Sequence, residues 1–175
     1  MEAAIVCIPF TVGHGVRPLD ELVAALHEAG VATLVDVRRV PGSRRNPQFN
    51  QGPLREALAD GGIAYRHAVE LGGRRSGEPG EERFACLGVA AFRSYAARMA
   101  APEWQEALAR SLEADRPCFL CAETLWWRCH RRLLADRLAA DGWTVLHLRI
   151  GAEPEPHRMT DVARLLQGRL RYGDG

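Results

Sequence analysis

The stretch PCFLCAETLWWRCHRRLLADRLAADG, residues 117–142, holds a strand, a polar loop and a helix in immediate succession. Its first five residues form a short apolar run, which is typical of a buried strand. After Cys129 the leucines recur at helical spacing, and the segment ends at Gly142, a common helix stop signal. A strand followed by a loop and a helix is the repeating unit of parallel sheets, so this stretch predicts an α/β fold.

The same alternation runs through the rest of the chain. Short apolar runs predict four further strands, at residues 3–10, 31–37, 63–69 and 143–149. Helical patterns cover residues 17–30, 53–62, 84–114 (in two pieces separated near Pro102) and 160–170, with Thr160 as N-cap. We therefore expect one three-layer α/β domain over residues 1–175, with a mostly parallel sheet of about five strands and helices on both faces.

Composition excludes several classes of function. The chain of 175 residues has a net charge of only +1, so any attraction to an anionic partner must come from a local patch. It contains no lysine, which excludes Schiff-base chemistry and a P-loop lysine. The five cysteines are irregularly spaced, and neither a signal-peptide pattern nor a membrane-spanning apolar stretch occurs. We expect a reduced, cytoplasmic protein without membrane contact.

Chemically capable residues gather in the loops that follow the predicted strands. Loops that leave parallel strands meet at one edge of a sheet, so a shared site is expected there. The loops are residues 11–15, 38–49, 70–75, 123–131 and 150–158. The glycine-rich and charged segment 71–82 also leaves this edge, and its composition predicts a mobile loop that acts as a lid.

Cys129 stands at the start of the predicted helix of the opening stretch. The helix dipole and the nearby arginines stabilise an anion there and lower the pKa of a thiol. This pattern indicates an anion-binding helix end or an activated thiolate, which His130 and Arg131 would join. The alternative is that Cys129 packs beneath the helix while the arginines are solvated.

The motif PCFLC resembles half of a zinc-deaminase signature, but the upstream H-x-E motif is missing. On a strand, Cys118 and Cys121 point to opposite faces, so Cys118 is expected in the core and Cys121 near the edge. Glu123 should find an arginine partner, with Arg38 and Arg131 as candidates. A zinc site from Cys121, Cys129 and His130 is conceivable, but their spacing matches no structural zinc module and a second half-site is missing, so no metal ligands are predicted and no cofactor is assigned.

Two further loops supply candidate residues. His14 lies between two glycines after the first strand, where it could act as an acid or base, or simply hydrogen-bond to Asp36. Asp36 ends the second predicted strand and precedes a loop that resembles a phosphate-reading segment or a solvated charge cluster, with Ser43 and four arginines, namely Arg38, Arg39, Arg44 and Arg45. The aromatic residues Phe49, Trp126 and Trp127 could stack on bases beside these arginines.

Taken in order, these motifs resemble the family called domain of unknown function 488. The resemblance rests on TVGHG, LVDVRRVPGSRRNPQF, GIAY, LGG, CAE and CHR, which lie between Thr11 and about His147. The chain departs from the family at Gly15, where Ser is more frequent, and in its tryptophan-rich segment after Cys121. The resemblance implies a compact bacterial or archaeal α/β domain of no established activity. It further implies one site, formed by His14, Asp36, Arg38, Pro41, Ser43, Glu123, Cys129, His130 and Arg131.

Three functions follow from these patterns. The first is an enzyme or binder acting on an anionic ligand (a phosphate-bearing small molecule, nucleotide or nucleic acid) at the carboxyl edge of the sheet. The catalytic residues would be His14, Glu123, Cys129 and His130, and the ligand-binding residues Asp36, Arg38, Ser43, Arg44 and Arg131. The second is a non-catalytic nucleic-acid or nucleotide-binding module. The third is a haem or metal-dependent protein.

Overall fold

The computed structural model of this chain describes residues 8–73 and 75–173. Its helices are α1 (Leu19–Glu28), α2 (Gln51–Asp60), α3 (Ala90–Arg98), α4 (Pro102–Leu112) and α5 (Arg131–Ala140). Shorter 3-10 helices are η1 (Pro47–Phe49), η2 (Val69–Leu71), η3 (Glu81–Phe84) and η4 (Trp126–Arg128). The strands are β1 (Phe10–Gly13), β2 (Thr33–Asp36), β3 (Ala64–His67), β4 (Pro117–Cys121), β5 (Leu146–Arg149), β6 (Ala152–Pro156), β7 (Ala163–Leu166) and β8 (Arg169–Tyr172).

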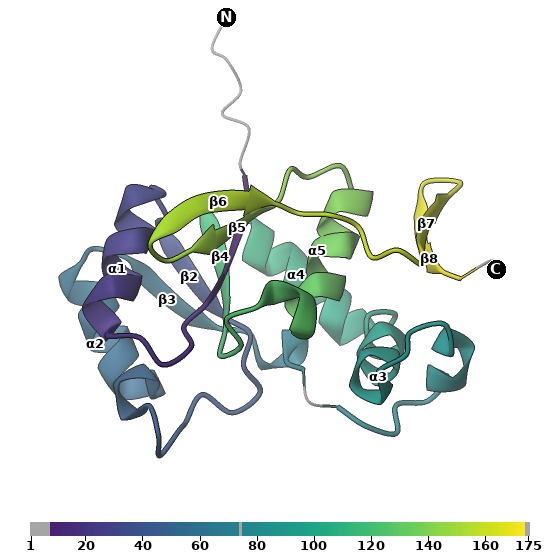
Figure 1. Ribbon diagram of the computed structural model, residues 1–175, viewed down its shortest axis with the longest axis horizontal. Coiled ribbons are helices and arrows are strands. Elements are labelled where there is room, and N and C mark those ends of the chain that lie inside the picture. Colours follow the sequence, from purple (N-terminus) through teal and green to yellow (C-terminus); the bar gives the residue numbers. More distant parts are fainter. Residues whose placement is uncertain (1–7, 74, 174–175) are drawn as a thin grey trace, which may run out of the picture.

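Within the described residues the main sheet has six strands in the order β3-β2-β4-β1-β5-β6 (Figure 1). Strands β1 to β5 are parallel to their neighbours, and β6 pairs antiparallel with β5. The predicted α/β class with a mostly parallel sheet is confirmed, with one strand more than expected. The extra strand, β6, gave no strand signal because its sequence AEPEP is exposed and holds two prolines, which sheets tolerate at an edge.

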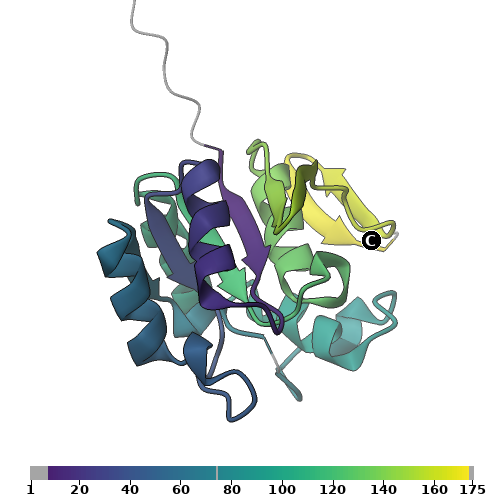
Figure 2. The ribbon, with the colours of Figure 1, turned by 60° about the vertical axis from the view of Figure 1, so that its left-hand side comes forward.

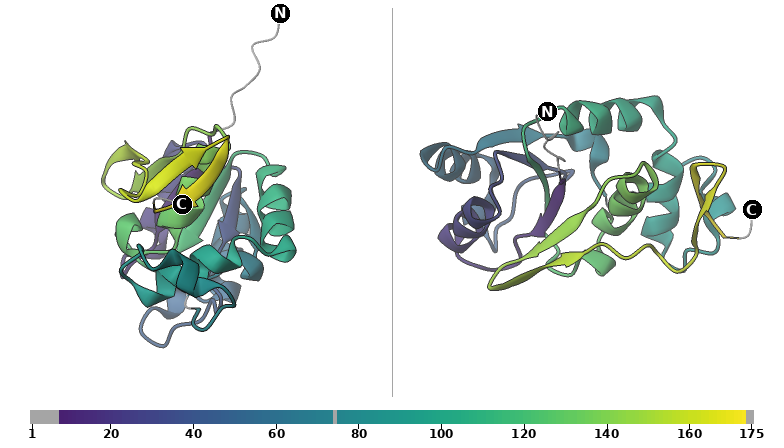
Figure 3. Two further views of the ribbon diagram at one scale, coloured as in Figure 1. Left: turned by 90° about the vertical axis from the view of Figure 1, so that its right-hand side faces the viewer. Right: turned by 90° about the horizontal axis from the view of Figure 1, so that it is seen from above.

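Helices cover both faces of the sheet, as predicted. Helices α1 and α2 pack on one face (Figure 2), where Leu22 and Leu54 meet Leu34 and Leu120. Helices α4 and α5 lie over the other face, seen from above in Figure 3. Within the part of the chain that is described, no helix has the length and hydropathy needed to span a membrane.

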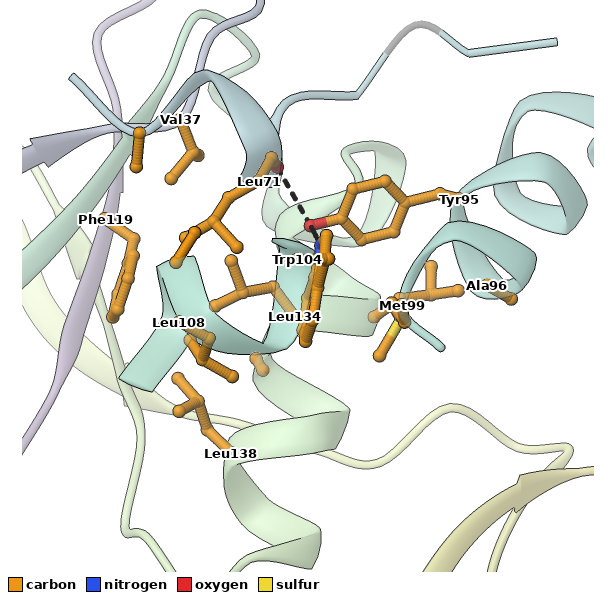
Figure 4. Close-up of a cluster of buried hydrophobic side chains, with 14 of the residues drawn as sticks. Val37, Leu71, Tyr95, Ala96, Met99, Trp104, Leu108, Phe119, Leu134 and Leu138 are labelled. Carbon is orange, nitrogen blue, oxygen red and sulfur yellow. Dashed lines mark hydrogen bonds between the residues drawn. The ribbon is translucent and has the colours of Figure 1, made fainter. Parts of the chain in front are cut away.

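The larger core lies on the α4–α5 face of the sheet and includes a hydrogen-bonded aromatic pair, Tyr95 and Trp104 (Figure 4). The Tyr95 hydroxyl donates to the Leu71 carbonyl and accepts from the indole N–H of Trp104, so both buried polar groups are satisfied. This pair joins α3 and α4 to the turn that follows β3. The predicted helical break near Pro102 is confirmed, because α4 begins at that residue.

Two of the predicted elements differ. Strand β1 covers Phe10–Gly13 and so includes the first three residues of the expected loop 11–15, while much of the predicted strand lies outside the described residues. The predicted helix over 160–170 is wrong, because β7 and β8 form a hairpin there. Gln167 and Gly168 both have positive φ, as a tight hairpin turn requires. Thr160 does not cap a helix; its hydroxyl donates to Asp136.

Candidate functional site

The carboxyl ends of β1, β2 and β4 meet at one edge of the sheet. The main chain beyond each strand stays tied to its neighbour, because the N–H of His14 donates to Cys121 and that of Val37 donates to Leu120. The expected gathering of His14, Asp36, Glu123 and Cys129 at one edge follows from this register. The edge therefore brings together groups that are more than a hundred residues apart in sequence.

A cavity of about 730 Å³ opens at this edge. It lies between the loop after β2, the start of α3, and the segment that joins β4 to α5. Its lining residues are Arg38, Arg39, Val40, Gly42, Ser43, Asn46, Gly73, Ala91, Phe92, Cys121, Ala122, Glu123, Arg128, Cys129 and His130. Of the predicted site residues, Arg38, Ser43, Glu123, Cys129 and His130 line the cavity, whereas His14, Asp36, Arg44 and Arg131 do not.

Asp36 and Arg38 form a buried ion pair beneath the cavity. Asp36 is fully buried and Arg38 is 7% exposed, and two guanidinium nitrogens donate to the two carboxylate oxygens at 2.8 and 2.6 Å. The remaining terminal nitrogen of Arg38 donates to the Phe49 carbonyl at 2.8 Å. Tyr65 donates its hydroxyl to the same carboxylate, and burial beside that negative charge raises the pKa of Tyr65. Both charged groups are thus committed to contacts within the protein.

His14 belongs to the same buried network. Its Nδ1 lies 2.8 Å from the Gly15 carbonyl and its Nε2 lies 3.2 Å from Arg38, while its ring stacks on Phe49. Burial lowers the pKa of His14 to about 4, and the hydrogen bond to Gly15 opposes that shift only in part. A neutral ring that donates from Nδ1 and accepts at Nε2 satisfies both contacts. The expected hydrogen bond to Asp36 is replaced by one to Arg38, and a catalytic role for His14 stays a prediction.

The loop after β2 is shaped by Ser43. Its hydroxyl accepts from the N–H groups of Arg45 and Asn46, and its own N–H donates to the Asn50 side chain. Arg44 is exposed and does not line the cavity. Ser43 thus holds the loop in place, and Arg39 is the arginine that lines the cavity next to Arg38.

Arg131 lies in the first turn of α5, as predicted, but its partner is not a carboxylate. Its guanidinium donates to the main-chain carbonyl of Glu123 and, at 3.3 Å, to the hydroxyl of Thr11. The Glu123 carboxylate is exposed and accepts from the N–H of Leu125. The expected ion pair between Glu123 and an arginine is therefore wrong: Arg131 fixes the main chain beside the cavity, and Asp36 takes Arg38.

Arg131 is connected through Thr11 to a buried chain of hydrogen bonds that ends at Asp136. The sequence did not indicate this chain. Thr11 bonds His147 at 2.6 Å, His147 bonds His157 at 3.0 Å, and His157 bonds Asp136 at 2.9 Å. If each residue donates toward Asp136, both rings are neutral and every contact has one proton. Burial is the main cause that lowers the pKa of His147 to about 3, and the proximity of the His157 ring, which disfavours a second proton in the pair, adds to it.

Cys121, Cys129 and His130 form a cluster at the buried end of the cavity. The Nδ1 atom of His130 lies 3.5 Å from the sulfur of Cys129 and 3.9 Å from that of Cys121, and the three side-chain atoms all lie within 4.8 Å of one another. Cys129 is 5% and His130 is 9% exposed. The Nε2 atom of His130 has no hydrogen-bond partner among the described residues. Two thiols and an imidazole that converge in this way are able to hold a metal ion or to share a proton.

The two thiols differ in acidity. Burial opposes the ionisation of Cys129, but a hydrogen bond from Cys121 and the proximity of His130 and Arg131 outweigh it, and the pKa of Cys129 lies well below its usual value. The same hydrogen bond, together with burial, raises the pKa of Cys121 well above its usual value. Cys129 is therefore the more easily ionised of the pair.

The aromatic side chains do not form the expected stacking platform. Phe49 is fully buried against His14, and Trp126 is 8% exposed and stacks on His147. Only Trp127 of the three is exposed, at 43%, and it is not part of the cavity lining. Gly73 lines the cavity from the loop over residues 70–75, which the sequence placed at this edge without singling out the glycine; Phe92 of α3, which also lines it, was not indicated by the sequence.

The family model described as Domain of unknown function DUF488 matches residues 18–138. The chain belongs to the DUF488 family. All residues that line the cavity fall within the matched region, whereas His14 and the β5–β8 segment lie outside it. No curated protein and no solved structure matches the chain.

Proposed function

We propose that this DUF488 protein is an enzyme that acts on an anionic, phosphate-bearing ligand bound in the cavity at the carboxyl edge of the sheet. The observation that carries the proposal is the composition of one cavity: exposed arginines, Arg39 and Arg128, stand at its mouth, and the Cys121–Cys129–His130 cluster lies at its buried end. Side chains that can bind an anion and side chains that can catalyse a reaction thus line the same cavity.

The charge balance of the lining supports an anionic ligand. Among the described residues, its charged members are Arg38, Arg39, Arg128 and Glu123. Asp36 neutralises Arg38 from below, and the exposed guanidinium group of Arg128 adds a positive charge to the lining. Guanidinium groups bind phosphate oxygens through paired, charge-assisted hydrogen bonds, and they remain charged at any physiological pH.

The buried cluster favours an enzyme over a binding module. A module that reads single-stranded nucleic acid needs exposed aromatic rings beside its arginines, but Phe49 and Trp126 are buried. A binding site also has no need of two thiols and an imidazole in contact at its innermost end. Thiols and imidazoles are the side chains that supply nucleophiles, proton acceptors and metal ligands.

Isothermal titration of the full chain with inorganic phosphate, pyrophosphate and a nucleoside triphosphate tests the binding step. At least one of these anions should bind, and Arg128→Gln should weaken binding about tenfold or more, as loss of a charge-assisted contact does. Arg55→Gln removes an exposed arginine outside the lining and serves as the control. Arg44→Gln tests the arginine that the sequence assigned to the ligand but that does not line the cavity.

Turnover of chromogenic phosphate monoesters and diesters tests the chemical step. The wild-type protein should release product, and Cys129→Ser should lose that activity while its thermal melt stays cooperative. Binding without turnover of any phosphoester would reduce the protein to a binder. An equal loss of affinity in Arg128→Gln and Arg55→Gln would place the anion site outside this cavity.

A further inference from the structure

The contacts between Cys121, Cys129 and His130 have the dimensions of a metal-ligand set. A tetrahedral zinc site with Zn–S bonds of about 2.3 Å and Zn–N bonds of about 2.0–2.1 Å places its sulfur and nitrogen ligands about 3.6 Å apart. The observed distances from His130 Nδ1 to the two sulfurs are 3.5 and 3.9 Å. The two sulfur-to-nitrogen distances are therefore close to those of such a site, and the three ligand atoms lie within 4.8 Å of one another.

We propose that Cys121, Cys129 and His130 bind a single zinc-class divalent ion through their two sulfurs and Nδ1, with the fourth coordination position open to the cavity. All three residues line the cavity, so an ion among them would face the bound ligand. Within the residues that the structure describes, no fourth His, Cys, Asp or Glu joins this group. Three protein ligands with an open position are characteristic of catalytic rather than structural zinc sites, and Cys₂His is one of the known sets.

The ligands are held by ordered main chain on both sides. Cys121 ends β4 and its carbonyl accepts from the N–H of His14, while the N–H of Cys129 donates to the carbonyl of Trp126 in η4. Arg131 joins the two segments through its hydrogen bond to the Glu123 carbonyl. A site built on a strand end and a helix start is prepared in advance, which lowers the entropic cost of metal binding.

Gly73 gives independent support, because it leaves room at the ligating atom. A Cβ at position 73 would overlap Nδ1 of His130, and its other nearest neighbours would be Cγ and Cβ of the same side chain. A β-carbon there would displace the imidazole from its position beside the two sulfurs. Gly42 lines the same cavity, yet a Cβ at that position would have nothing within 4 Å.

A bound ion would also take part in the proposed reaction. Only this catalytic role of the ion rests on the proposed function. Two thiolates neutralise a divalent cation, so the site would not repel the arginines that bind the anionic ligand. A zinc ion with an open position polarises a phosphoryl oxygen or activates a water molecule. Binding of the ion itself requires only the three side chains and does not depend on the substrate.

Cobalt substitution of the purified, reduced full chain tests the site. After removal of bound metal with a chelator, Co²⁺ should bind in equimolar amount and give visible ligand-field bands of tetrahedral intensity and a sulfur-to-cobalt charge-transfer band. Zn²⁺ should displace it and abolish the colour. Cys129→Ser and Cys121→Ser should lose most of the charge-transfer intensity, whereas Cys86→Ser, which changes an exposed cysteine outside the cluster, should keep it.

Alkylation of the cysteines, mapped by mass spectrometry, tests the site in the wild-type protein and therefore remains informative if a cysteine variant does not fold. In the wild-type protein Zn²⁺ should protect Cys121 and Cys129 from iodoacetamide and leave the labelling of Cys86 unchanged. Gly73→Ala should weaken metal binding about 10–100-fold, as displacement of supporting groups does, while Gly42→Ala should bind like the wild type.

Several results would overturn the proposal. They are a cobalt complex without sulfur charge transfer, spectra that Cys129→Ser leaves unchanged, equal protection of Cys86, or equal effects of Gly73→Ala and Gly42→Ala. Metal binding without any anion binding would refute the proposed function and leave the metal site standing. Anion binding and turnover that persist after complete metal removal would refute the catalytic part of this inference alone.

Discussion

Replacement of Arg38 by methionine should destabilise the fold strongly, because it leaves the Asp36 carboxylate buried without its cation. Asp36 is fully buried, and after the substitution it would keep only the main-chain N–H of residue 38 and the hydroxyl of Tyr65. Removal of one partner of a buried ion pair costs about 3–5 kcal/mol. In a chain of this size about 1 kcal/mol corresponds to a shift of roughly 2–4 °C, so the melting temperature should fall by about 6–20 °C.

Urea and thermal melts followed by circular dichroism would measure this effect. Arg44→Met is the matched control, since Arg44 is exposed on the same loop and its loss should change stability by less than about 0.5 kcal/mol. The double variant Asp36→Asn with Arg38→Met should be less destabilised than the sum of the two single variants, because it removes both charges. Equal melting temperatures for Arg38→Met and Arg44→Met would refute the reasoning, and so would strict additivity in the double variant.

The remaining predictions concern the buried polar chain behind the cavity. The pKa of His147 is lowered to about 3 in the fold and is about 6.5 when unfolded, so stability should fall as the pH drops through that window. Between pH 7 and 5 His147 should account for about 2 kcal/mol of the loss in urea melts, and His14, whose pKa is lowered to about 4, should add a similar amount. His147→Phe should lose that part of the pH dependence, and an unchanged pH slope in this variant would assign the effect to another group. Arg131→Met should cost about 1.5–3 kcal/mol, since the Glu123 carbonyl loses its charged, fully buried donor. Arg137→Met, which breaks an exposed ion pair with Asp141, should cost less than about 1 kcal/mol, and comparable shifts in the two variants would contradict a structural role for Arg131.

Local patterns in the sequence were sufficient for the strand–helix alternation and the shared edge of the sheet. They failed over residues 160–170, where the leucines fit a helical period and an alternating one equally well. Contacts between residues distant in sequence favour the hairpin over the helix. Tyr172 donates to Asp136 and packs in the core beside α5, which holds the β7–β8 hairpin in place. Single-sequence periodicity contains no information on such a contact.

The site shows the same limit. Spacing located Arg131 in the first turn of a helix, but the argument that a carboxylate such as that of Glu123 needs this arginine was wrong, because the Glu123 carboxylate is exposed. Arg131 donates instead to a main-chain carbonyl and to Thr11, which lies 120 residues earlier in the chain. In the same way, His14 contacts Arg38 and not the expected Asp36. Residue types thus indicated which side chains gather at the edge, and only the folded chain determined which of them pair.

The pairing separates the arginines that line the cavity into two functional groups. Arg38 donates two hydrogen bonds to Asp36 and one to Phe49, and it lies within hydrogen-bonding distance of His14, so most of its donors are in use. A ligand could recruit it only by competing with a fully buried carboxylate, which would then be left without its cation. Arg38 therefore stiffens the cavity wall, and the proposed recognition of an anion would depend on exposed guanidinium groups such as that of Arg128 in η4. For this reason Arg38→Met is expected to change mainly stability, and Arg128→Gln mainly affinity.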